Sequence, residues 1–154
     1  LLYAMESGGW SKDNITQAPV SLTQVHTKEL NSQFDQLRVV TKIAAFMYDN
    51  LAETYTKDKN SRDIIIAGAL LHDLGKFTEF VPRDGKVQYA ENAKLIRHPL
   101  SGAIIAKNFD LPDTIVHIIA VHSFEGKDSH ATLESNIVKL ADATAFIYIT
   151  SFNP

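Results

Sequence analysis

Between Ser21 and Tyr55 the chain has neither proline nor glycine, and apolar residues recur there at steps of three and four. This spacing places apolar side chains on one face of an α-helix. We therefore predict a long amphipathic helix over this segment, with room for one break near Asn31–Ser32. The residues that carry the pattern are Phe34, Leu37, Val40, Ile43, Ala44, Met47 and Leu51.

Shorter helical segments follow this long helix. A nearly continuous apolar run from Ser61 to Leu71 predicts a core helix that ends near Gly75. Prolines suited to a first helical turn predict helices over Pro99–Phe109 and Pro112–His122, and a last helix is expected over Thr132–Tyr148. These segments predict an all-α domain of about five or six helices.

The remaining segments carry turn signals in place of a period. Residues 1–19 contain Gly8-Gly9 and Pro19, and we expect an irregular lead-in before a helical domain over residues 20–154. Residues 82–92 include Pro82 and Asp84-Gly85, which predict a loop with room for a small hairpin.

The core helix ends in an unusual pair, His72-Asp73, directly after its apolar run. Burial of an imidazole or a carboxylate without a partner is costly, and both groups are good ligands for divalent metals. Lys76 follows His72 by one helical turn, a position from which its ammonium group could reach a bound phosphate. The pair alone also fits a capped helix end with a hydrogen-bonded histidine.

Three further residues are candidates for the same site. His98 precedes Pro99 at a helix start, and His122 ends an apolar helix, although either position also suits a structural histidine. Asp142 interrupts the apolar stripe of Val138 and Ala145 on the last helix. A carboxylate in such a stripe needs a charged or metallic partner, which could also be a lysine.

Composition limits the chemistry further. The chain has 154 residues, a formal net charge of -3, a sequence pI of about 6.1 and no cysteine. Disulfides and thiolate metal sites are therefore excluded, and an extended nucleic-acid surface is not expected. No apolar stretch approaches the roughly 18 residues that span a bilayer, and residues 1–19 lack the pattern of a signal peptide. We expect a cytoplasmic protein without membrane contact.

Three stretches together resemble the HD superfamily of metal-dependent phosphohydrolases, in order, spacing and helical context. They read LLHDLGKF, HPLSGAIIAKNFDLPDTIVHIIAVHS and IVKLADA. The resemblance implies an HD-domain-like helical bundle with one or two divalent ions, which could be Mn, Fe, Ni, Mg or Zn. It implies metal ligands at His72, Asp73, His98, His122 and Asp142, a catalytic role for Asp73, and substrate phosphate contacts by Lys76.

The opening helix departs from the family pattern, which usually has one more histidine there. Gln36 takes its place in this chain, or Asp35 if the register shifts by one residue. Adjacent helical residues point about 100° apart, so only one of the two can face the site. We expect Gln36 to face it and Asp35 to reach solvent. Asp35 could replace the imidazole as an oxygen ligand, whereas Gln36 would be a poor ligand.

The function that the resemblance implies is hydrolysis of a small-molecule phosphate ester by metal-activated water, with a nucleotide or nucleotide-like substrate. Bound metal would lower the pKa of water, and Lys76 would neutralise phosphoryl oxygens. Two alternatives stay open. The chain could be a di-iron oxygenase of the same superfamily, or a non-catalytic binding or signalling module that has kept the fold.

Overall fold

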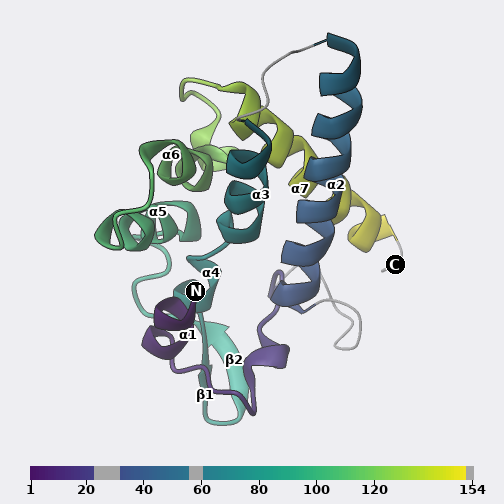
Figure 1. Cartoon of the computed structure of the whole chain (residues 1–154). Coiled ribbons are helices and arrows are strands. Elements are labelled where there is room, and N and C mark those ends of the chain that lie inside the picture. The colour runs from purple at the N-terminus through teal and green to yellow at the C-terminus, as the bar shows by residue number, and fades with distance from the viewer. Residues whose placement is uncertain (23–31, 56–60, 152–154) are drawn as a thin grey trace.

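A computed structural model of the chain describes residues 1–22, 32–55 and 61–151. Within them the chain is mainly helical, with one small antiparallel hairpin, and Figure 1 shows the arrangement. The helices in chain order are α1 (Leu2–Ser7), α2 (Gln33–Tyr55), α3 (Ser61–Leu71), α4 (Lys76–Glu79), α5 (His98–Asn108), α6 (Asp113–Val121) and α7 (Leu133–Ser151). Short 3-10 turns at Ile15–Gln17 (η1) and Phe124–Gly126 (η2) complete them.

The core helix α3 lies at the centre of the bundle. It packs against α2 and α7 on one side and against α6 on the other, and α5 lies beyond it beside α6 (Figure 1). The four helices α2, α3, α6 and α7 share one apolar core. Its fully buried members include Val40, Ala44, Ile65, Ala69, Ile118, Val138 and Ala141.

The inner face of α2 explains how polar groups reach the interior. Its buried positions follow the three- and four-residue period, and two glutamines begin the stripe that apolar residues continue. Gln33 and Gln36 are therefore carried inward by the same face that packs Leu37 and Val40 against the core. They lie where α2 begins, next to the turn that follows α3.

The predicted helices are present, with small shifts at their ends. Helix α5 begins at His98, one residue before the expected start, and α7 ends at Ser151. The long first helix was expected from Ser21, but α2 begins at Gln33: Ser21, Leu22 and Ser32 are not helical, and Ser32 instead pairs with Pro19 in an isolated β-bridge. Residues 23–31 of the expected helix lie outside the described residues. The hairpin that the turn residues allowed is formed by β1 (Phe80–Arg83) and β2 (Lys86–Tyr89).

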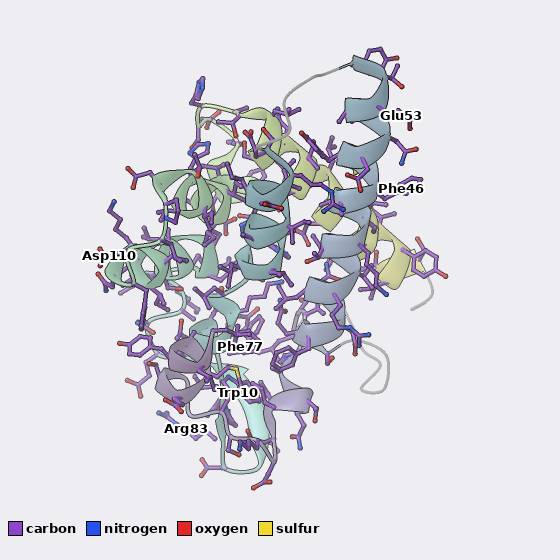
Figure 2. All side chains as sticks on the ribbon, in the orientation of Figure 1. Trp10, Phe46, Glu53, Phe77, Arg83 and Asp110 are labelled. Carbon is purple, nitrogen blue, oxygen red and sulfur yellow. The ribbon has the colours of Figure 1, made fainter. Side chains whose placement is uncertain are left out.

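The expectation of an irregular lead-in over residues 1–19 was wrong for part of it. Residues 2–7 form α1, and Trp10 is buried with its indole N–H donating to the carbonyls of Phe77 and Phe80 at 2.9 and 3.0 Å. Figure 2 shows Trp10 close to Phe77. Tertiary packing stabilises this segment, and its apolar residues have no helical period. The sequence pattern therefore did not predict the helix.

No helix within the described ranges is long and apolar enough to cross a membrane.

Candidate metal centre

His72 and Asp73 lie in the four-residue turn that links α3 to α4, not inside a helix. The apolar faces of α3 carry this turn into the interior, where both side chains are 0% exposed. Gly75 in the same turn lies against the start of α5, because a Cβ atom there would be only 2.1 Å from the carbonyl oxygen of His98. Because Gly75 has no side chain, the backbone of His98 can lie close to the turn.

The carboxylate of Asp73 is the centre around which the other groups gather. Its Oδ2 accepts a hydrogen bond from Gln33 Nε2 at 2.9 Å and pairs with Lys76 Nζ at 2.8 Å. Its Oδ1 faces the Nε2 atoms of His98 and His122, each 3.4 Å away. One oxygen is thus held by donors, and the other points toward two imidazoles.

All three histidine rings are fixed through Nδ1. The Nδ1 atoms of His72 and His122 lie 2.7 and 2.8 Å from the carbonyl oxygens of Ala69 and Ile119. The Nδ1 of His98 lies 2.7 Å from the carboxylate of Glu79. Because these partners only accept, each Nδ1 must carry a proton, and the Nε2 atom of each ring lies 3.2–3.4 Å from a carboxylate oxygen of Asp73.

Asp142 joins the site from α7. Its Oδ1 lies 3.4 Å from His72 Nε2 and accepts a hydrogen bond from Gln36 Nε2 at 2.9 Å. Asp35 points away, as an exposed residue bonded to Ser32 and paired with Arg38. The structure therefore places His72, Asp73, Lys76, His98, His122, Asp142 and Gln36 around one centre, and leaves Asp35 outside it.

Two residues of the centre were missed by sequence reasoning, namely Gln33 and Glu79. Gln33 lies three residues before Gln36, so the shared helical face could have indicated it. Glu79 ends the short helix α4, and its contact with His98 depends on how closely α5 approaches that helix. No local pattern carries that information.

The charges at the centre stabilise one another. Burial alone would lower the pKa of His72, but the carboxylates of Asp73 and Asp142 outweigh it and raise the pKa to about 10. Burial opposes ionisation of Asp73, yet Lys76 and His72 hold the pKa of that carboxyl well below its usual value. Burial lowers the pKa of His122, which favours the neutral ring that a metal requires. The ionised carboxylates of the centre therefore stabilise positive charge beside them.

The residues present fit a divalent metal ion. His72 Nε2 and Asp73 Oδ1 are buried without a hydrogen-bond partner among the described residues, a costly arrangement in the absence of a cation. His72, Asp73 and His122 offer ligand atoms that all lie within 4.8 Å of one another. Two ligands bound at about 2.0–2.2 Å with a tetrahedral angle lie about 3.4 Å apart. The spacing of His122 Nε2 from Asp73 Oδ1 equals that value.

The helical bundle, the buried His-Asp turn and the converging imidazoles are together typical of helical domains with a metal site. Comparison with known proteins identifies the family. The sequence pattern of the family described as HD domain matches residues 37–147. The chain belongs to the HD domain family. The matched region starts just after Gln36.

One curated relative is a protein of Methanocaldococcus jannaschii named dihydroneopterin 2′,3′-cyclic phosphate phosphodiesterase. It is 34% identical over 131 residues, which cover 84% of this chain and 51% of the relative. The chain therefore spans about half the length of that relative. No solved structure matches the chain significantly.

Proposed function

We propose that this chain is a metal-dependent phosphohydrolase that opens or cleaves a phosphate ester of a nucleotide-like compound. The observation that carries the proposal is the convergence of three Nδ1-anchored imidazoles on the carboxylate of Asp73. Two of them, His98 and His122, face its Oδ1, which has no hydrogen-bond partner among the described residues. Such a set of nitrogen and oxygen donors suits Mn, Fe, Ni or Zn. Membership of the HD domain family and the phosphodiesterase relative support the same reaction class.

His72, Asp73 and His122 would hold the first ion, with Asp142 and His98 beside them. When bound, a divalent ion supplies a Lewis acid that lowers the pKa of water and stabilises charge on phosphoryl oxygens. Gln33 and Gln36 orient the two carboxylates through their amide N–H groups. The ammonium group of Lys76 pairs with Asp73 Oδ2 at 2.8 Å, so it adds a positive charge at the centre that a substrate phosphate could use.

The substrate class is supported by a pocket beside the centre. A cavity of about 400 Å³ between α2 and α7 is lined mainly by apolar side chains, and Gln36 contributes to its wall. Its lining residues are Asp35, Gln36, Val39, Ile43, Thr144, Ala145, Tyr148 and Ile149. The volume is in the range of small-ligand sites, and the apolar walls suit a flat organic ring. We infer that the ring of the ester lies there while its phosphate lies near Lys76.

The pterin of the relative's named substrate is such a ring, and a 2′,3′-cyclic phosphate is the first ester to test. Hydrolysis adds water to phosphorus and breaks one phosphorus–oxygen bond of the cyclic ester. The products are a phosphate monoester and a free hydroxyl group, whose proton comes from the water. The side chain of Asp142 is 23% exposed, so we infer that a cyclic phosphate approaches the centre from that side.

The decisive experiment combines metal analysis with a panel of phosphate esters, and compares the natural chain with Asp73→Asn. We expect the natural chain to retain a divalent metal and to hydrolyse cyclic phosphates. The variant should lose metal and activity while its circular dichroism stays helical, because the amide cannot supply the charged oxygen. Metal with oxygen uptake but no hydrolysis would favour the oxygenase alternative. Unchanged metal content in the variant would contradict the proposed centre.

A further inference from the structure

His98 differs from the other two histidines of the centre in what holds its ring. His72 and His122 bond to neutral backbone carbonyls of their own helices, three residues earlier in each case. His98 bonds instead to the carboxylate of Glu79, which comes from another helix. A local carbonyl follows from helix geometry alone, whereas a buried carboxylate from α4 is a separate feature of this fold.

Glu79 holds His98 at two points. Its Oε2 accepts the backbone N–H of His98 at 2.8 Å and lies 2.7 Å from the ring Nδ1. The two bonds fix both the first residue of α5 and the rotation of its imidazole. Glu79 is only 2% exposed, so this carboxylate is removed from water and must be stabilised by the protein.

Arg97 supplies the opposing charge. Its Nε lies 2.9 Å from Glu79 Oε1, the oxygen that His98 does not use. Arg97 also reaches Glu125 of η2, with its Nη2 3.6 Å from Glu125 Oε1. Each oxygen of Glu79 therefore has its own partner, and the chain Arg97–Glu79–His98 leads from a half-exposed guanidinium to the centre.

We propose that Glu79 is a positioning residue, which keeps the proton of His98 on Nδ1 and directs Nε2 toward Asp73. A charged acceptor binds an N–H donor about twice as strongly as a neutral one, so Glu79 favours this tautomer more than a carbonyl would. A carboxylate behind an imidazole also makes the free nitrogen a better metal ligand. The use of His98 as a ligand rests on the proposed function, but its tautomer does not.

Glu79→Gln tests the proposal with little change of shape. The neutral amide has one oxygen, so it can accept from His98 or from Arg97 but would present an NH₂ group to the other. We expect nitrogen NMR of the metal-free protein with ¹⁵N-labelled histidine, at alkaline pH, to show Nδ1–H in the natural chain and a mixture of tautomers in the variant. A His98→Asn variant identifies the His98 signals.

Titration with Mn²⁺ or Zn²⁺ gives the second measurement. Loss of a carboxylate behind a ligating histidine typically lowers metal affinity about 10–100-fold, which is the loss expected for Glu79→Gln. The matched control is Glu91→Gln, which removes a surface carboxylate paired with Arg83 and should change neither measurement.

If Glu79→Gln does not fold, Arg97→Gln removes the stabilising charge and should shift the same tautomer to a smaller extent. Natural His98 signals in a folded Glu79→Gln chain would overturn the proposal, whatever the activity. A natural chain that shows the predicted tautomer but binds no metal would contradict the proposed function and leave the positioning role supported.

Discussion

The two glutamines of α2 show how much one residue can change at this centre. Each amide donates to a carboxylate through Nε2, and each Oε1 is buried without a partner among the described residues. Such atoms carry a desolvation cost of about 1–3 kcal/mol each. Gln36 is the residue that we expect at the family's usual histidine position, and its amide orients Asp142 from α2.

Gln36→His is expected to raise metal affinity, because it would restore a nitrogen donor on the face of α2 that points to Asp142. Metal titration of the purified variant measures the effect. Asp35→Ala is the matched control on the neighbouring position, and it should leave the titration unchanged because Asp35 bonds to Ser32 and pairs with Arg38, away from the centre. A strong loss with Asp35→Ala beside no change in Gln36→His would reverse the roles assigned to the two residues.

At the scale of elements, the centre depends on the close approach of α5 to the turn after α3. The Gly75 backbone lies against His98 and Gly102 of α5, and an added Cβ would overlap the His98 carbonyl and Gly102 N at 2.1 and 2.7 Å. The contact is made by backbone on both sides, which side-chain rearrangement cannot relieve. The position of His98 is therefore set by packing of α5 as well as by Glu79.

Gly75→Ala is expected to displace α5, with a loss of stability of about 1–3 kcal/mol for overpacking and a weakened metal site. Urea unfolding and metal titration measure the two effects. Gly85→Ala provides the control, since Gly85 has a φ of 72° in the hairpin turn and no atom of the described residues lies within 4 Å of an added Cβ. It should cost roughly 1 kcal/mol through backbone strain and leave metal affinity unchanged. Natural metal affinity in Gly75→Ala would show that the approach of α5 is not required.

The sequence indicated the elements that a period can reveal. Helices α2, α3, α5, α6 and α7 were predicted because each buries an apolar face, and the motif residues stood out because polar groups interrupt those faces. Glu79 could not be predicted, since its burial depends on α5, and α1 could not because it has no period. Interactions between elements are set by tertiary packing, which a local pattern does not encode.

At the scale of the whole molecule, two clusters of buried apolar residues hold the elements that carry the centre. One is the core of α2, α3, α6 and α7, and the other joins the first residues of the chain to the segment from Leu74 to Phe80. The second cluster contains Ala4, Trp10, Ile15, Leu74 and Phe77. Gly8 also lies against the carbonyl of Phe77, and α1 packs against α4.

Trp10→Phe is expected to destabilise the chain by about 1–3 kcal/mol, because the carbonyls of Phe77 and Phe80 lose the indole donor and a smaller ring fills the space. Urea unfolding followed by far-ultraviolet circular dichroism measures the change. Tyr55→Phe is the control, since that ring is 82% exposed at the end of α2. Equal midpoints for the two variants would show that the first residues contribute little to the fold.

The position of Trp10 has a further consequence for experiments on this chain. It is the single tryptophan, and its indole touches the backbone of the segment that carries Lys76 and Glu79. Emission after selective excitation of tryptophan therefore comes from one place, beside the carbonyls of Phe77 and Phe80. The chain carries its own optical reporter, through which ordering of the segment behind the centre can be followed in real time without a dye.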